Sequence, residues 1–288
     1  MSEIKKPAAK PSIAKILASK PLTSVEPKVS TANERVKAAR KPDRPRIGDY
    51  IDALFDDFFE THGDRLYGDD KTMLCGIATF EGRPITVAGT IKGTDLESNL
   101  ATNFGMASPE GYRKFQRAAR QAEKFGRPII TFIDTPGASP TATAEENGQG
   151  EAIARCLYEL SALKTPVIAI VTGEGGSGGA LALGLADRVI MLENAVYSVL
   201  SPEGFASILW KDSSRSAEAA DVMKLTAEDL RRFGMADTIV REPRGGAGAN
   251  RPAIMRAVRH VLRRSLEEVL QTEIDALVAQ RYEKYRKF

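Results

Sequence analysis

The spacing of hydrophobic residues changes along the chain, and each spacing predicts a different kind of element. Over 49–59 the apolar residues recur every three or four positions, which predicts an amphipathic helix that ends at 62–64. Two strand-like runs follow, 73–80 and 85–90, and the turn-forming residues at 81–84 between them predict a hairpin.

The middle of the chain alternates helical patterns with short apolar runs. The predicted pairs of helix and strand are 109–125 with 129–133, 144–163 with 167–171, and 179–186 with 189–191. Apolar runs without alternating polar residues are typical of strands that are buried on both faces. We therefore expect an α/β protein with a largely parallel sheet.

The two ends of the chain differ in pattern from this middle part. Residues 1–30 combine four prolines with Lys, Ala and Ser and lack an apolar period, which predicts a flexible basic leader before a domain over 31–288. Residues 252–287 carry one apolar stripe from Ile254 to Val278, which predicts a long C-terminal helix. Acidic residues interrupt the basic face of this helix, which favours packing on the core or a partner over a membrane surface.

Composition and charge exclude several classes of protein. The 288 residues are 42% hydrophobic, yet no stretch approaches the roughly 18 apolar residues of a membrane span, and no signal peptide is evident. Two distant cysteines and two histidines exclude a disulfide framework and predict no metal site, as expected in the cytoplasm. Residues 1–46 carry a net charge of +8 and the remainder −5, a distribution that does not favour nucleic-acid binding.

A glycine-rich run, 173–179, between a predicted strand and a predicted helix is the strongest candidate for chemistry. It contains G-x-G-x-x-G, with Glu193 placed like a ribose-binding acid, but it does not follow the first strand of its unit. It also contains G-x-S-x-G with Ser177 as a nucleophile, for which His260 is the only downstream histidine.

Two further interpretations of the glycine run need no side chain. Glycines at a helix N-terminus expose backbone N–H groups that can form an oxyanion hole. The same glycines can instead allow close packing of a helix on the sheet, although five glycines among the seven residues 173–179 favour a functional role. The run remains compatible with all four interpretations.

The segment 133–140 follows the preceding parallel strand and is expected to line the same crevice as the glycine run. The position of Asp134 in this segment is at least as typical of a turn or cap residue as of a catalytic residue. A third cluster, 103–114, opens a helix with Pro109 near its first turn.

Taken together, these segments resemble the carboxyltransferase α subunit of the multi-subunit bacterial acetyl-CoA carboxylase. The resemblance covers 31–288 and rests on Arg44-Pro45, Asp49-Tyr50-Ile51, Gly63-Asp64-Arg65, Asp69-Asp70-Lys71, Lys92-Gly93, Asn103 to Lys114, Ile133 to Ala138, Ala144-Glu145-Glu146, Gly148-Gln149, Glu151 to Ala154, Gly173 to Ala182, Tyr197-Ser198-Val199, Ser201 to Gly204 and Ala206 to Lys211. So many motifs in order are far more specific than any single glycine pattern.

The resemblance implies a crotonase-like (ClpP/crotonase) fold, in which ββα units stack into a superhelix. It implies transfer of a carboxyl group from N-carboxybiotin on a carrier protein to acetyl-CoA, which gives malonyl-CoA for fatty acid biosynthesis. It also implies a site shared with a β subunit that binds CoA and contributes the only zinc, activity only with that subunit, and a tetramer of two α and two β subunits. The biotin carboxylase component uses ATP, and neither nucleic acid nor a membrane is required.

The resemblance also implies roles for individual residues. The N–H groups of Gly178 and Gly179 are expected to stabilise developing oxyanions, because the biotin anion can itself accept the methyl proton and no protein base is needed. The expected substrate-binding residues are Gly137 and Ala138, which shape the facing wall, together with Lys92, Asn103, Phe104 and Gly105.

Several positions depart from the family pattern. Ser139 and Thr141 stand where tyrosine and glycine are usual, Asn147 and Gly150 replace an arginine and a serine, and 94–99 is less basic than the familiar segment after Lys92. These departures keep two alternatives beside the carboxyltransferase: a divergent regulatory α-like subunit, and a serine hydrolase that uses Ser177.

Overall fold

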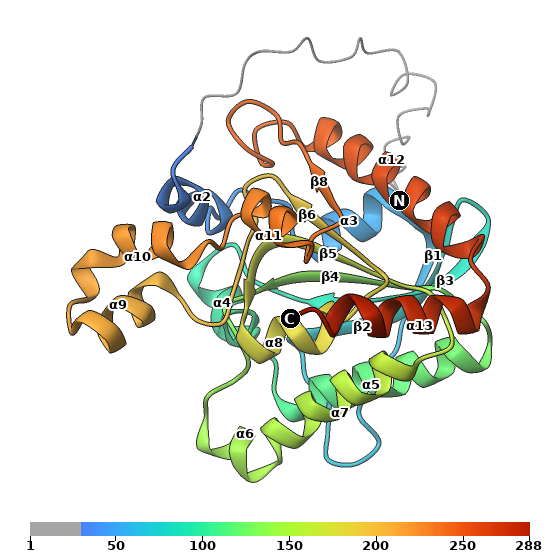
Figure 1. The fold of residues 1–288 in the computed structure, drawn as a ribbon. Coiled ribbons are helices and arrows are strands. Elements are labelled where there is room, and N and C mark those ends of the chain that lie inside the picture. The colour runs from blue at the N-terminus through green and yellow to red at the C-terminus, as the bar shows by residue number, and fades with distance from the viewer. Residues whose placement is uncertain (1–29) are drawn as a thin grey trace, which may run out of the picture. The chain divides into compact units, whose positions relative to one another are not determined.

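A computed structural model describes residues 30–288, of which Thr31–Phe288 form one compact unit (Figure 1). The predicted leader, 1–30, lies outside the described residues except for Ser30. The strands are β1 (Asp56–Glu60), β2 (Met73–Phe80), β3 (Arg83–Thr90), β4 (Ile129–Thr135), β5 (Val167–Gly176), β6 (Arg188–Leu192), β7 (Val196–Ser198) and β8 (Thr238–Val240). The α-helices are α2 (Ala32–Ala39), α3 (Ile47–Leu54), α4 (Leu96–Ala101), α5 (Pro109–Lys124), α6 (Ala142–Glu146), α7 (Gln149–Ala162), α8 (Ser177–Gly184), α9 (Pro202–Trp210), α10 (Ser216–Met223), α11 (Ala227–Phe233), α12 (Arg251–Leu270) and α13 (Ile274–Tyr285).

The strands form one sheet in the order β1-β2-β3-β4-β5-β6-β8, and β7 pairs with the end of β5. The strands β1, β2 and β3 are antiparallel, whereas β3 to β8 pair in parallel. Every residue of β4 and β5 is buried, because α5 and α7 lie on one side of the sheet and α3 and α12 on the other (Figure 1). The predicted hairpin and parallel sheet are confirmed.

Three predicted helices differ from the structure. The helix expected over 49–59 ends at Leu54, and the aromatic-rich residues after it form the edge strand β1, whose side chains favour strand packing. The helix expected over 144–163 is divided into α6 and α7, because Gly148 has a left-handed φ of +85°.

The long helix expected over 252–287 is also two helices, α12 and α13. The Glu273 side chain accepts hydrogen bonds from the N–H groups of Asp275 and Ala276, so it caps a new helix although the apolar stripe continues. Among residues 30–288, no helix combines the length and the apolar character needed to cross a membrane.

A buried arginine fixes α13 to the amino end of the sheet. Arg281 donates to both carboxylate oxygens of Asp187 at 2.8 Å, and the exposed fractions of the two side chains are 0% and 1%. The same guanidinium donates to the carbonyl oxygens of Leu160, Leu163 and Thr165 at 2.6–3.0 Å. All of these acceptors lie around the end of α7 and the start of β5 and β6, so Arg281 joins three elements to α13.

Replacement of Arg281 by methionine should lower the free energy of unfolding by about 3–5 kcal/mol, because it leaves the Asp187 carboxylate buried without its cation. Urea denaturation followed by circular dichroism measures this loss. The matched control is Lys164→Ala, which removes the exposed pair between Lys164 and Asp275 (2.9 Å) that also joins α13 to the body. Equal losses in the two variants would contradict the role assigned to Arg281.

Candidate active site

The glycine run and the segment 133–140 lie side by side at the carboxyl ends of two neighbouring parallel strands, β4 and β5, as the parallel order predicts. A side chain at Gly176 would overlap the carbonyl oxygen of Pro136. A Cβ at Gly179 would lie 2.7 Å from the carbonyl carbon of Gly137 and 2.8 Å from the nitrogen of Ala138. Glycine at 176 and 179 therefore allows the two segments to touch backbone against backbone.

The helix α8 begins directly after β5 without a side-chain cap. Its N-cap residue is Gly176, so no side chain accepts from the first turn. The N–H groups of this turn lack intrahelical acceptors by geometry, and within residues 30–288 no loop carbonyl or side chain accepts from Gly178 or Gly179. The turn can therefore bind a negatively charged oxygen, aided by the positive end of the helix dipole.

The structure distinguishes the two glycines that the sequence treated alike. Gly179 is buried against the Gly137-Ala138 wall, whereas a Cβ at Gly178 would meet only the side chain of Ile153, at an ordinary 3.4 Å. Gly178 also has no left-handed φ. Ser177 does have one, at +51°, and its side chain is exposed.

A network of buried charges lies beneath the glycine run. Asp134, at the end of β4, accepts the N–H of Glu174 at 3.0 Å and pairs with Arg46. Its carboxylate also occupies the space where a side chain at Gly173 would be. Lys92, just after β3, lies 2.7 Å from Glu174 and 3.4 Å from Asp134. These contacts fix the ends of β3, β4 and β5 relative to one another.

The network continues outward from Glu174 to two helices. Arg40, which caps the end of α2, donates to Glu174 at 2.7 Å and to Glu203 of α9 at 2.7 Å. Burial alone raises the pKa of the Asp134 carboxyl, but the charges of Lys92 and Arg46 outweigh burial and hold that pKa below its usual range.

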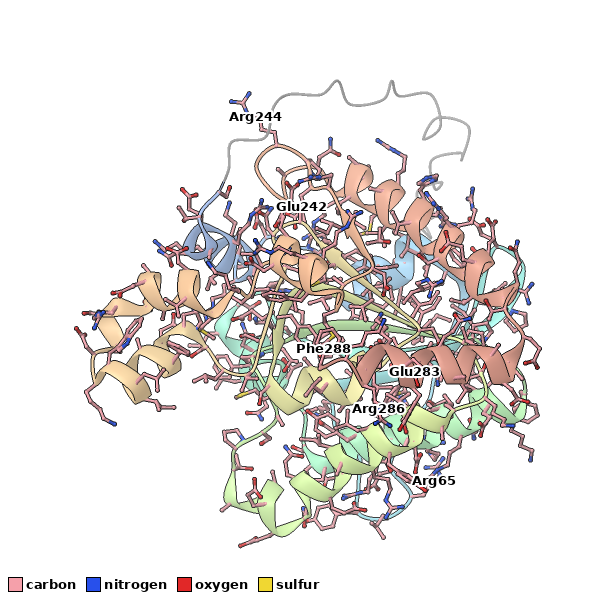
Figure 2. All side chains as sticks on the ribbon, viewed as in Figure 1. Arg65, Glu242, Arg244, Glu283, Arg286 and Phe288 are labelled. Atoms are coloured by element: carbon pink, nitrogen blue, oxygen red, sulfur yellow. The ribbon has the colours of Figure 1, made fainter. Side chains whose placement is uncertain are left out.

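A second buried pair holds β5 just before the glycine run. Arg44 lies 2.8 Å from Glu242, and the exposed fractions of the two side chains are 2% and 0%. Arg44 also donates to the carbonyl oxygen of Thr172 at 2.6 Å. Figure 2 shows Arg244 extending away from the body, so the chain passes from a buried carboxylate to the exposed surface within two residues.

The other predicted binding residues lie next to this network. Asn103, Phe104 and Gly105 have left-handed φ values of 43°, 55° and 82°. A Cβ at Gly105 would lie 3.1 Å from the carbonyl oxygen of Asp134 and 3.4 Å from Cβ of Lys92, so this strained turn borders the end of β4. Phe104 is 40% exposed, whereas the ammonium group of Lys92 contacts carboxylates of the chain itself.

Residues that depart from the family pattern form local contacts around α6. The Thr141 side chain accepts the N–H of Ala144 at 3.2 Å and lies 3.3 Å from the Ser139 hydroxyl. Asn147 donates to Glu110 at 3.2 Å, whereas Gly150 is exposed, and a Cβ there would meet no atom within 4 Å. After Lys92, Asp95 caps α4, whose Leu96 and Leu100 are exposed.

Two of the alternative interpretations of the glycine run depend on a second residue, Glu193 or His260, and the structure places both residues in other surroundings. Glu193, the candidate ribose-binding acid, accepts the N–H of Glu242 and pairs with Arg241. His260, the candidate partner of Ser177, lines a cavity with Arg264 and Glu268 of the same helix. The Ser177 hydroxyl forms no hydrogen bond with the part of the chain that the structure describes, 30–288.

Sequence reasoning missed Arg40, Arg46 and Glu174 as parts of this site. The one local signal was an acidic residue, Glu174, inside a run of glycines at the end of a buried strand, where an unpaired charge is costly. Its cationic partners could not be found in the same way, because Arg40 is 134 residues distant in sequence.

Two solved structures that resemble the chain are those of a transcarboxylase and a decarboxylase. Transcarboxylase 12S with hydrolysed methylmalonyl-coenzyme A has a TM-score of 0.65 at 19% identity, and the match covers 88% of this chain and 48% of that one, so the chain spans about half its length. A Pseudomonas malonate decarboxylase hetero-tetramer with coenzyme A has a TM-score of 0.62 at 18% identity over 75% of this chain and 86% of that one. The fold is the crotonase-like fold of carboxyltransferases.

Sequence comparison defines the family. The family described as "Acetyl co-enzyme A carboxylase carboxyltransferase-like" matches residues 18–288. The acetyl-coenzyme A carboxylase carboxyl transferase subunit alpha of Clostridium botulinum (strain Eklund 17B) is 56% identical over 90% of this chain and 94% of that protein. The protein of the same name from Anoxybacillus flavithermus is 56% identical over 88% and 78%. The chain belongs to this family of carboxyltransferase α subunits.

The tight contact at Gly179 yields a test of the backbone arrangement. Gly179→Ala should destabilise the protein by about 1–3 kcal/mol, because the new methyl group cannot fit against Gly137 and Ala138 without a backbone shift. Gly178→Ala is the matched control and should cost nothing, since its methyl group meets only Ile153. Urea denaturation measures both, and an equal cost at the two positions would contradict the assigned contact.

The charge of Asp134 should appear in the pH dependence of stability. Its folded-state pKa is lowered, so the ionised carboxylate stabilises the fold above its unfolded pKa of about 4, and this contribution is lost as the pH falls through the folded pKa. The difference in unfolding free energy between the parent and Asp134→Asn should therefore shrink below about pH 4. Denaturation curves at several pH values test this, and a difference that is independent of pH would refute it.

Proposed function

We propose that this chain, together with a β subunit, transfers a carboxyl group from N-carboxybiotin on a carrier protein to acetyl-CoA, which yields malonyl-CoA for fatty acid biosynthesis. The observation that carries the proposal is the uncapped first turn of α8, held against the Gly137-Ala138 wall. Family membership supports the reaction, because the named relatives are acetyl-coenzyme A carboxylase carboxyl transferase subunits.

In this proposal the N–H groups of Gly178 and Gly179 hold the oxygen on which negative charge develops. Such fixed donors are each worth about 3–4 kcal/mol of transition-state stabilisation. Carboxybiotin would supply the carboxyl group as CO2 and, once that group has left, a basic ureido group that accepts the acetyl methyl proton before the new carbon–carbon bond forms. The chain then needs donors in a fixed position more than it needs an ionisable side chain, and the uncapped turn fits that need.

The charged network serves this turn by positioning it. Asp134 and Glu174 hold the strand ends, while Lys92, Arg40 and Arg46 neutralise them, so the two carboxylates do not repel a developing oxyanion nearby. Lys92 thus contributes to binding through the backbone it holds. Asn103, Phe104 and Gly105 supply a rigid turn at the rim, with the exposed Phe104 ring available to a substrate.

We further propose that the complete site forms with a β subunit. The relatives are named as alpha subunits, and the malonate decarboxylase that shares the fold is a hetero-tetramer. The β subunit would bind most of CoA and carry the zinc, in a cytoplasmic assembly of two α and two β subunits. Biotin carboxylase, which consumes ATP, and the biotin carboxyl carrier protein would complete the enzyme.

The chain alone should therefore transfer no carboxyl group and should gain activity when a cognate zinc-ribbon β subunit is added. Malonyl-CoA formation from carboxybiotin carrier and acetyl-CoA measures this. Full turnover by the isolated chain would overturn the shared site. A complex that assembles yet stays inactive would support the alternative of a regulatory α-like subunit. That alternative rests on the departures from the family pattern at Ser139, Thr141, Asn147 and Gly150.

Ser177→Ala is the control for the hydrolase alternative. The variant keeps every backbone donor, so carboxyl transfer should stay within a few-fold of the parent. A nucleophilic Ser177 would instead lose about a thousandfold or more on substitution. Gel filtration of the assembled complex shows that the variant is correctly folded before its rate is compared.

A further inference from the structure

A cavity of about 600 Å³ opens at one end of the sheet, and the glycine run lies at the other end. The cavity lies at the amino ends of β6 and β8, whereas the glycine run includes the carboxyl end of β5, and these strands are parallel. Its lining comes from the starts of β6 and β8 and from α11 and α12: Arg188, Arg231, Asp237, Thr238, His260, Val261, Arg264, Ser265 and Glu268. This volume is in the usual range for small-molecule sites.

Positive charge exceeds available negative charge in this cavity. Three arginines line it, and of its two acids Asp237 is already engaged. The Asp237 carboxylate accepts the N–H of Val189 at 2.6 Å and pairs with Lys284. Only Glu268 remains to balance Arg188, Arg231 and Arg264.

Glu268 is shared between two of these arginines and satisfies neither fully. One oxygen lies 3.1 Å from Nε of Arg264, and the other lies 3.7 Å from Nε of Arg188, which is too long for a hydrogen bond. The Glu268 side chain is 44% exposed, so an incoming anion can displace it at little cost.

Several polar groups in the cavity have no partner in the described part of the chain, 30–288. They are the guanidinium of Arg231, the hydroxyl groups of Thr238 and Ser265, and the ring of His260, none of which forms a side-chain hydrogen bond or ion pair there. Hydroxyl and guanidinium donors that converge on one space without acceptors are suited to an anion with several oxygens.

We propose that this cavity binds a small molecule through a phosphate or diphosphate group. The guanidinium groups of Arg188, Arg231 and Arg264 bind the anionic oxygens, Thr238 and Ser265 donate from the walls, and Glu268 turns away to solvent. Arginine suits this role because its planar donors match phosphate geometry. The proposal goes beyond carboxyl transfer and does not depend on it.

Isothermal titration calorimetry of the full chain with inorganic pyrophosphate tests the site, and ADP in a second titration shows whether a nucleoside adds affinity. Arg231→Ala should weaken pyrophosphate binding about tenfold, through loss of charged hydrogen bonds. Glu268→Gln should strengthen it about two- to fivefold, because a competing carboxylate is removed. The matched control is Arg83→Ala, which changes an exposed arginine of the β2–β3 hairpin that does not line the cavity and has no ion pair within residues 30–288.

Absence of saturable binding by the parent chain would overturn the proposal, as would equal affinities in Arg231→Ala and Arg83→Ala. Binding by the isolated chain that disappears in the assembled enzyme would also overturn it, since the cavity would then be a partner contact. The titration needs no carboxyl transfer, so its outcome is separate from that of the activity assays. Thermal unfolding curves confirm that each variant is folded before titration.

Discussion

The arrangement of the active-site edge depends on how closely the ends of β4 and β5 approach. Two glycines of β5 make this approach possible for different reasons. Gly173 leaves room for the carboxylate of Asp134, and Gly176 leaves room for the carbonyl oxygen of Pro136. A side chain at either position would separate the strand ends, and the first turn of α8 would then lose its fixed position against Gly137.

A buried carboxylate at this contact requires cations, and their supply explains much of the surrounding architecture. Arg46 comes from the start of α3 and Lys92 from the end of β3, so two elements remote in sequence are brought to Asp134. Glu174 has the same need and draws in Arg40 of α2. A buried charge left alone is far more costly than a pair, so displacing any one of these elements would also destabilise the packing of the others.

The sequence predicted those features that depend on neighbouring residues. The strands β4 and β5 were predictable because unbroken apolar runs require burial on both faces, and the adjacency of the segments at their carboxyl ends followed from their parallel order. The edge strand β1 was missed because Phe58 and Phe59 fit both a helical stripe and a strand that packs on β2. The Arg40 and Glu174 contact joins residues too distant for any local pattern, and the unequal roles of Gly178 and Gly179 depend on what lies opposite each.

The clamp between Arg281 and Asp187 has a consequence for the synthesis of the chain. The two residues are 94 positions apart, so the ribosome must add 94 residues after Asp187 before its guanidinium partner exists. At bacterial and eukaryotic elongation rates this takes roughly 5–20 s. For that interval the amino ends of β5 and β6 carry an uncompensated carboxylate, so this corner of the sheet completes its folding late, after translation has produced α13.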